Sequence, residues 1–167
     1  FEYQLKTSGL KTSNTLKPDF NWAGLDINGI KSKYNLKKYI LLFPFCSPHL
    51  TIKKWPYYND LINLISNKFG DEYKILTAPG PKEIIDAQEI NALSVLDNGK
   101  SLDVSQLTSL IIDSSFVVAN DTGPAHISAH VGARGLTLFG THTTAHKVSI
   151  ERKNFKAIEV SDLNNLS

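Results

Sequence analysis

The polar residues best suited to chemistry lie in one short segment, Phe116–His126, whose sequence is FVVANDTGPAH. Asp121 and Thr122 follow an apolar run and come just before Pro124, a residue that favours the first turn of a helix. Gly123 lets a ligand approach the backbone closely, and the unpaired N–H groups of a helix N-terminus suit a phosphate. The segment therefore predicts either an anion-binding site or a plain helix cap made by Asp121 or Thr122, and these two interpretations stay open.

A second polar segment, Phe45–Pro56, has the sequence FCSPHLTIKKWP and also follows an apolar run. Ser47 and Thr51 supply hydroxyl groups, and Lys53 and Lys54 supply positive charge. A loop of this composition can bind a pyrophosphate, with lysine acting as a point charge. The alternative is a basic loop that only faces solvent.

The histidines include two pairs spaced four residues apart, His126 with His130 and His142 with His146. Together with Asp121, the first pair has a spacing that metal sites use. No cysteine and no cluster of carboxylates accompanies the pairs in sequence, so we expect no metal site. We predict instead that the imidazole of His126 contacts a phosphate or a sugar hydroxyl.

These segments need strands and helices to position them, and short apolar runs alternate with stretches of helical spacing along the chain. The expected strands are Tyr39–Phe45, Lys74–Ala78, Ser94–Leu96, Phe116–Ala119, Leu136–Phe139 and Ala157–Val160. The expected helices are Trp55–Phe69, Lys82–Leu93, Val104–Asp113 and Ala125–Val131. This alternation predicts an α/β fold of βαβ units with a mostly parallel sheet and right-handed crossovers. Ligands bind beyond the carboxyl ends of such strands, where both polar segments fall.

The composition excludes several classes of protein. The chain has 167 residues, with 18 Lys and Arg against 16 Asp and Glu, which suits one globular domain and gives no electrostatic case for nucleic-acid binding. The single cysteine, Cys46, excludes an internal disulfide framework and a cysteine-based zinc site. No apolar run is long enough to span a membrane. The phosphate-loop motif G-x-x-x-x-G-K-[ST], the dinucleotide motif G-x-G-x-x-G and the nucleophile motif G-x-S-x-G are all absent.

The N-terminal part differs from the rest. The chain begins with Phe1 and contains no Met, and it shows no signal peptide, so we expect a fragment, a processed product or an excised piece of a longer protein. The stretch Phe1–Leu10 predicts a short helix, and Asn21–Lys38 predicts a linker or a wrapping arm.

The segment FVVANDTGPAHISAHVGARGLTLFG, together with three others, carries a resemblance to the ADP-heptose:lipopolysaccharide heptosyltransferases, glycosyltransferase family nine. It resembles the family's signature of an apolar strand, D-T-G-x-x-H, a short helix and a strand that ends in F-G. CSPHLTIKKWP is similar to the family's S-x-x-K-R-W-P loop, APGPKE to its G-G-P-x-E turn, and SLDVSQLTSLIIDSSFVV to its S-L-x-E-L-A-x-L-I segment. The combination covers about residues 39–145.

The resemblance implies a GT-B architecture, in which two Rossmann-like domains with helices on both sheet faces meet across a cleft. The chain then corresponds to the C-terminal half, with residues 39–167 as the nucleotide-sugar donor-binding domain. Residues 1–38 would be the linker and the end of a preceding domain. The family's catalytic Asp is expected in that other, N-terminal domain, so no catalytic residue is assigned in this chain.

The family's donor-binding residues carry over position by position. Asp121 matches the Asp that contacts the donor sugar, Thr122 and Gly123 match the residues that bind the diphosphate, and His126 matches the histidine of the motif.

Four further positions match outside that motif. Lys53 matches the phosphate-binding lysine, and Ser47 matches the hydroxyl residue earlier in the same loop. Leu102 falls where an apolar residue packs on adenine, and Glu83 falls where an acidic residue lies near the ribose. The chain departs from the family after Gly140, where Thr141–Thr144 replaces P-T-x-P.

The resemblance therefore implies the donor-binding part of an inverting glycosyltransferase that moves heptose from ADP-heptose to a lipopolysaccharide core acceptor. It further implies no cofactor and no metal, a lipid-linked acceptor bound by the other domain, and a cytoplasmic location at the inner face of the inner membrane. Two alternatives stay open: a relative that uses another nucleotide sugar, and a nucleotide-sugar-binding module without activity of its own.

Overall fold

The computed structural model describes residues 2–11 and 19–166. Within this part of the chain, one six-stranded sheet has the order β3-β2-β1-β4-β5-β6, and every neighbouring pair of strands is parallel. The strands are β1 (Tyr39–Phe43), β2 (Lys74–Thr77), β3 (Leu93–Ser94), β4 (Phe116–Asn120), β5 (Gly135–Phe139) and β6 (Phe155–Glu159). This strand order is the one that defines Rossmann folds, so the predicted fold class is confirmed.

Six α-helices lie in the described part of the chain, and the first two of them precede β1. They are α1 (Glu2–Thr7), α2 (Asn28–Tyr34), α3 (Tyr58–Phe69), α4 (Val104–Ile112), α5 (Gly123–His130) and α6 (Ala145–Val148). Short 3-10 helices are Asn21–Ala23, Thr51–Lys53, Gly70–Glu72, Asp86–Glu89 and Leu163–Asn165.

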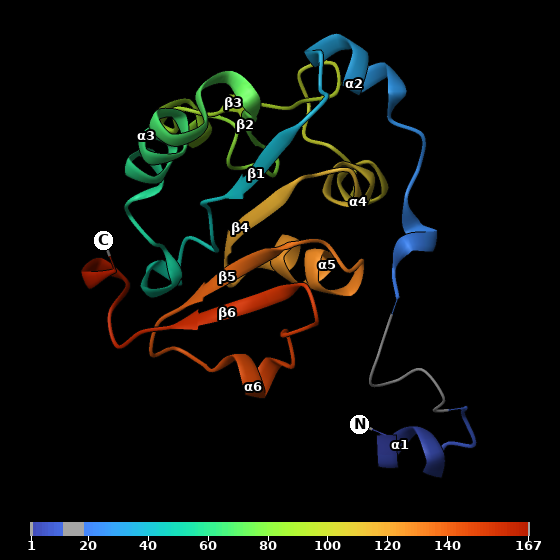
Figure 1. Ribbon diagram of the computed structural model, residues 1–167. Coiled ribbons are helices and arrows are strands. Elements are labelled where there is room, and N and C mark those ends of the chain that lie inside the picture. The colour runs from blue at the N-terminus through green and yellow to red at the C-terminus, as the bar shows by residue number, and fades with distance from the viewer. Residues whose placement is uncertain (1, 12–18, 167) are drawn as a thin grey trace.

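Both faces of the sheet are covered, because the buried side chains of β1 alternate between two cores. Leu41 and Phe43 belong to a core that includes residues of α2, α4 and α5. Ile40 and Leu42 belong to a second core on the other face, together with residues of α3 and the C-terminal 3-10 helix. Figure 1 shows α3 on one side of the sheet and α4 and α5 on the other. Burial on both faces explains why β1 is an unbroken apolar run.

The helix predicted over Lys82–Leu93 is wrong. Residues 81–85 form turns, Asp86–Glu89 forms a short 3-10 helix, and Leu93–Ser94 already belongs to β3. Ala87 is the one fully buried side chain in the stretch, and Ile85 is exposed. Helices in proteins are stabilised mainly by packing an apolar face, and this segment buries too little for an α-helix.

The segment predicted as a linker or arm, Asn21–Lys38, contains the helix α2 and three residues of the main core, Ile27, Ile30 and Leu36. The prediction missed this helix because it has only seven residues and one buried position, Ile30, so its sequence shows no helical spacing of apolar residues. The short helix predicted over Phe1–Leu10 is confirmed as α1. Residue 1 and residues 12–18 of the predicted N-terminal arm lie outside the described residues.

Candidate functional site

The site lies at the carboxyl ends of β1 and β4, where the strand order reverses direction. This is the place at which open α/β sheets bind ligands, because the loops leave the two strands on opposite faces. A pocket of about 770 Å³ opens there. All the residues predicted to bind the donor line it, and they are Ser47, Lys53, Glu83, Leu102, Asp121, Thr122, Gly123 and His126. The structure thus brings them together, while their roles stay a prediction.

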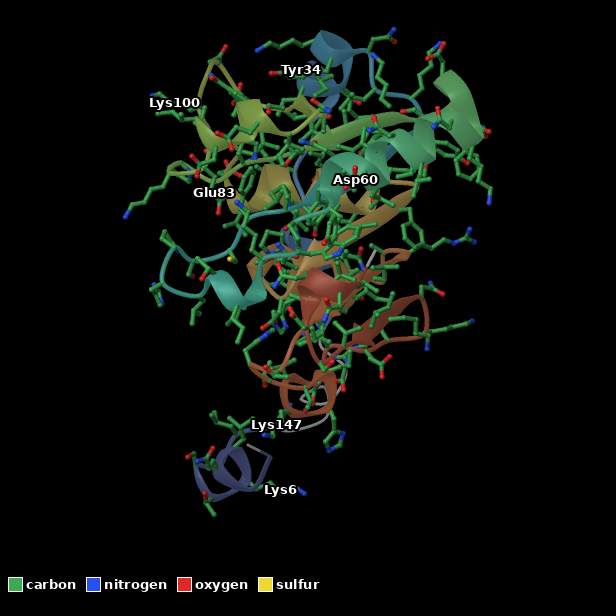
Figure 2. All side chains as sticks on the ribbon, turned by 90° about the vertical axis from the view of Figure 1, so that its left-hand side faces the viewer. Lys6, Tyr34, Asp60, Glu83, Lys100 and Lys147 are labelled. Carbon is green, nitrogen blue, oxygen red and sulfur yellow. The ribbon has the colours of Figure 1, made fainter. Side chains whose placement is uncertain are left out.

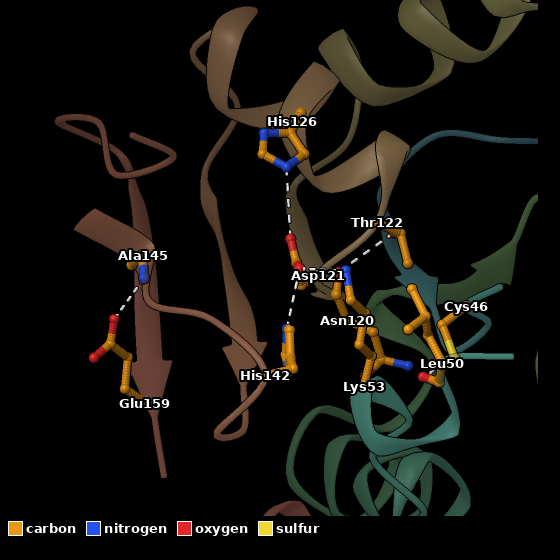
Figure 3. Close-up of polar contacts among 10 residues, drawn as sticks. All are labelled: Cys46, Leu50, Lys53, Asn120, Asp121, Thr122, His126, His142, Ala145 and Glu159. Atoms are coloured by element: carbon orange, nitrogen blue, oxygen red, sulfur yellow. Dashed lines mark hydrogen bonds and ion pairs between the residues drawn. The ribbon is translucent and has the colours of Figure 1, made fainter. Parts of the chain in front are cut away.

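Asp121 is the centre of the polar network in this pocket. Its Oδ2 atom lies 2.7 Å from Nζ of Lys53 and 3.0 Å from Nε2 of His142. Its Oδ1 atom lies 3.5 Å from Nε2 of His126. Figure 3 shows the two histidines on opposite sides of the carboxylate. Residues from the segments that follow β1, β4 and β5 therefore converge on one side chain.

The carboxylate of Asp121 is ionised in this environment. Burial acts to raise its pKa, but the hydrogen bonds from His126 and Lys53, the charge of Lys53 and the hydrogen bond from His142 outweigh burial. Together they hold the pKa of Asp121 well below the usual range of an aspartate. The site can thus offer a negative charge on Asp121, which suits hydroxyl groups, next to the positive charge of Lys53, which suits a phosphate.

The side chains of the Asp-Thr-Gly segment do not cap α5, contrary to the helix-cap interpretation. Thr122 is the N-cap of α5, but its side chain accepts no capping hydrogen bond, and its hydroxyl lies 3.3 Å from the carbonyl oxygen of Asn120. Asp121 points into the network just described instead of capping the helix. With Gly123 and Pro124 also lining the pocket, the N-terminus of α5 faces the space where a ligand would lie.

A buried asparagine holds the two main loops together, and the sequence analysis did not single it out. Asn120 is fully buried at the end of β4. Its Nδ2 donates to the carbonyl oxygen of Pro44 at 2.8 Å, and its Oδ1 accepts from the backbone N–H of Trp55 at 3.3 Å. The hydroxyl of Tyr58 lies 3.2 Å from the same Oδ1 atom. Asn120 therefore ties the start of Asp121's loop to both ends of the loop that carries Lys53.

The lining of the pocket also contains a carboxylate held by the backbone and apolar side chains. Oε2 of Glu83, which follows β2 in the chain and is labelled in Figure 2, accepts a hydrogen bond from the backbone N–H of Gly80 at 2.8 Å. Leu102 and Leu107 line the same pocket and pack on the main core. An acceptor beside an apolar wall suits a ribose and the flat ring of a base.

Further lining residues were absent from the predicted set, among them Cys46, Lys54 and Lys82. Burial raises the pKa of the Cys46 thiol, although the charges of Lys54 and Lys53 act in the opposite direction. The thiol is therefore neutral and hydrogen-bonds to the carbonyl oxygen of Leu50 at 3.4 Å.

The histidine pairs noted in the sequence do not act as pairs. His130 lies 3.2 Å from Arg152 and packs on Phe20, whereas His146 is exposed on α6. His142 was the missed member of the site. The rule that parallel strands end at one edge could have found it, because β5 is the neighbour of β4.

Within the described ranges, residues 2–11 and 19–166, no three His, Cys, Asp or Glu side chains are arranged to hold a metal ion. In the same residues, no helix has the length and apolar character needed to cross a membrane.

Comparisons with known proteins add to this picture. The model of "Glycosyltransferase family 9 (heptosyltransferase)" matches residues 5–162. No curated protein sequence matches the chain.

Among solved structures, E. coli heptosyltransferase WaaC with ADP matches with a TM-score of 0.69 and 20% identity, over 98% of this chain and 50% of that one. E. coli ADP-heptose lps heptosyltransferase II matches with a TM-score of 0.68 and 16% identity, over 95% of this chain and 49% of that one. The S. aureus MnaA–UDP co-structure matches with a TM-score of 0.58 and 19% identity, over 99% and 46%. The chain thus spans about half the length of these structures, and at such identities the likeness shows the fold.

Proposed function

Since the chain belongs to glycosyltransferase family 9, the heptosyltransferase family, we propose that it binds the nucleotide-sugar donor of an inverting glycosyltransferase. In this proposal the donor is ADP-heptose, and the heptose goes to a lipopolysaccharide core acceptor. The observation that carries the proposal is the contact between Lys53 and Asp121 in the pocket at the switch point of the sheet. One side chain of the pair suits a diphosphate and the other suits sugar hydroxyls.

The pocket offers a matching group for each part of such a donor. Lys53 and the N-terminus of α5 would bind the diphosphate, with Thr122, Gly123 and the hydroxyl of Ser47 beside them. Asp121 and His126 would bind the sugar. Glu83 would bind the ribose, and Leu102 would pack on the adenine.

In this proposal, residues 39–167 are the donor-binding domain, and residues 1–38 are the linker and the end of a preceding domain. The chain spans about half of the matched WaaC structure, which supports the proposal that the donor and the acceptor are bound by different halves of the full protein. The catalytic base and the acceptor site would then belong to the other half, and this chain alone would be inactive. The reaction would take place in the cytoplasm at the inner membrane face, where fractionation of cells can detect the protein.

Another nucleotide sugar is the second candidate. The fold also matches MnaA in complex with UDP, and the loop Thr141–Thr144 at the sugar end departs from the family pattern. A donor panel of ADP-heptose, other ADP-sugars and UDP-sugars separates these candidates by affinity. A module without activity of its own is the third candidate, and it predicts donor binding without transfer when the full-length protein is assayed with an acceptor.

The deciding experiment compares ADP with ADP-heptose in calorimetric titrations of two variants. Lys53→Ala removes the positive charge that would contact the diphosphate, so both ligands should lose about 1.5–3 kcal/mol of binding free energy. Asp121→Asn keeps the side-chain shape but removes the anion, so ADP-heptose should lose affinity while ADP binds as before or more tightly. ADP gains because the substitution removes a negative charge that repels the diphosphate and that pairs with Lys53.

Matched controls come from α3, where Lys68 and Asp60 are exposed and do not line the pocket. Lys68→Ala and Asp60→Asn should leave both affinities unchanged. Equal losses for the two ligands in Asp121→Asn would contradict a sugar contact and leave only a nucleotide-binding fold.

A further inference from the structure

The loop after β5 places a histidine against the carboxylate at the centre of the pocket. Nε2 of His142 lies 3.0 Å from Oδ2 of Asp121, and the side chain is only 7% exposed. The imidazole ring stacks on Phe139, with ring centroids 5.8 Å apart and planes 14° from parallel. Because the ring is packed and buried, its direction toward Asp121 is fixed by the fold.

The other ring nitrogen of His142 is the reason to look for a role. Nδ1 is buried and has no hydrogen-bond partner among the residues that the structure describes. A buried polar atom without a partner is unfavourable, and an apolar side chain would fill the same space without that cost. We therefore attribute the histidine at this position to its contact with Asp121. We assign the ring proton to Nε2, since the group that faces Nε2 is a carboxylate, which only accepts.

The arrangement around Asp121 shows what this contact does when a donor arrives. Lys53 and His142 both contact the same atom, Oδ2, while Oδ1 has, within the described part of the chain, only the longer 3.5 Å contact with His126. If Lys53 turns to a diphosphate, as the proposed function requires, His142 is the remaining short contact to Oδ2. It would keep that oxygen in place and leave Oδ1 directed at the sugar.

We propose that His142 is a positioning residue that holds Asp121 for the sugar part of the donor and so determines the preference for a nucleotide sugar over the free nucleotide. This inference rests on the proposed function, because it assumes that Lys53 binds the diphosphate and Asp121 the sugar. His142 itself touches neither the reacting atoms nor the phosphates.

Calorimetric titration of His142→Leu and His142→Gln with ADP and ADP-heptose tests the proposal. In His142→Leu the affinity for ADP should stay within about twofold, whereas the affinity for ADP-heptose should fall about tenfold, as for one lost hydrogen bond to a charged group. Glutamine can place an amide N–H near the former Nε2, so His142→Gln should recover most of the preference. His146→Leu, an exposed histidine on α6, is the control and should change neither affinity.

Imidazole ¹⁵N NMR gives a readout that needs no ligand. The His142 signals should show the proton on Nε2 and should shift in Asp121→Asn but not in the control Asp60→Asn. A proton on Nδ1, or His142 signals that do not change in Asp121→Asn, would contradict the proposed contact between His142 and Asp121.

The titrations separate the two proposals. A wild-type chain with no preference for any nucleotide sugar contradicts the proposed function and the role built on it. A wild-type preference that survives in His142→Leu overturns the role of His142 alone, and so does a loss that His142→Gln does not repair.

Discussion

Asn120 and Asp121 are neighbours in the sequence, but Asn120 is buried beneath the pocket residues whereas Asp121 lines the pocket. The amide group of Asn120 makes its hydrogen bonds to other parts of the protein. It binds backbone groups of Pro44 and Trp55 and lies within hydrogen-bond distance of the Tyr58 hydroxyl. Burial raises the pKa of the Tyr58 hydroxyl well above its usual value, so that group keeps the proton it donates. Asp121 instead faces the pocket with a charge that Lys53 partly balances.

Asn120→Ala should destabilise the fold by about 2–4 kcal/mol, because it leaves the Pro44 carbonyl and the Trp55 N–H buried without partners. Asn59 is the matched control, since it also makes two hydrogen bonds to backbone, with Glu89 and Asn91, but does so at the surface. Asn59→Ala should cost less than about 1 kcal/mol because water replaces its partners. Urea unfolding measures both, and equal losses would contradict the bridging role of Asn120.

The sequence could predict the residues of the pocket but not its internal contacts. Asp121, Gly123 and Lys53 stand out locally, because each belongs to a polar segment that follows an apolar run. Nothing in the local sequence says that Asn120 points inward or that His142 contacts Asp121, which lies 21 positions away along the chain. Those contacts depend on which strands are neighbours, and this is information of longer range than any motif.

At the scale of elements, prediction succeeded where one strong pattern dominates. The run of β1 and the helical spacing of α3 and α4 predicted those elements to within a few residues. Prediction failed for the helix over Lys82–Leu93, because that segment has no apolar face that packs on the core. It also failed for α2, which is too short to show a helical spacing of apolar residues. Tertiary packing, which the local sequence does not contain, decided both cases.

Gly135 at the start of β5 is a position where packing allows no side chain. A Cβ atom there would meet the carbonyl oxygen of Val117 and would lie 2.9 Å from Cε2 of Phe155. Gly135→Ala should therefore destabilise the sheet by about 1–3 kcal/mol. Gly29 in α2 is the control, because nothing lies within 4 Å of its added Cβ.

Since alanine favours a helix, Gly29→Ala should be neutral or stabilise the fold by up to about 1 kcal/mol. Thermal unfolding of the two variants checks the pair. A Gly135→Ala protein as stable as the wild type would show that β4 and β6 can move apart to accommodate a methyl group.

At the scale of the whole molecule, the site exists because distant segments end at one edge of the sheet. The sequence predicted a mostly parallel sheet from the alternation of strands and helices, but it contains no local signal for strand order. The family resemblance implied a Rossmann-like sheet without stating its strand order, and the structure shows β1 beside β4. This neighbourhood brings Lys53 within 2.7 Å of Asp121, although the two are 68 positions apart.

The charge of the pocket leads to the last prediction, which concerns metal dependence. Lys53 and Lys54 line the pocket beside the N-terminus of α5, and together they can offset the charge of a diphosphate. In many other phosphate sites a divalent ion supplies that charge. We therefore expect ADP to stabilise this chain equally in Mg²⁺ and in EDTA, by about 2.7 kcal/mol at a concentration of 100 times Kd.

Thermal unfolding with and without ADP in the two buffers measures this stabilisation. Lys53→Ala is the control for binding at the proposed place, since it should reduce the shift caused by ADP in both buffers alike. A shift that disappears in EDTA and returns with Mg²⁺ would contradict the prediction, because it would mean that the lysines and the helix N-terminus do not suffice. A shift that Lys53→Ala leaves intact would place the nucleotide outside the pocket at the switch point.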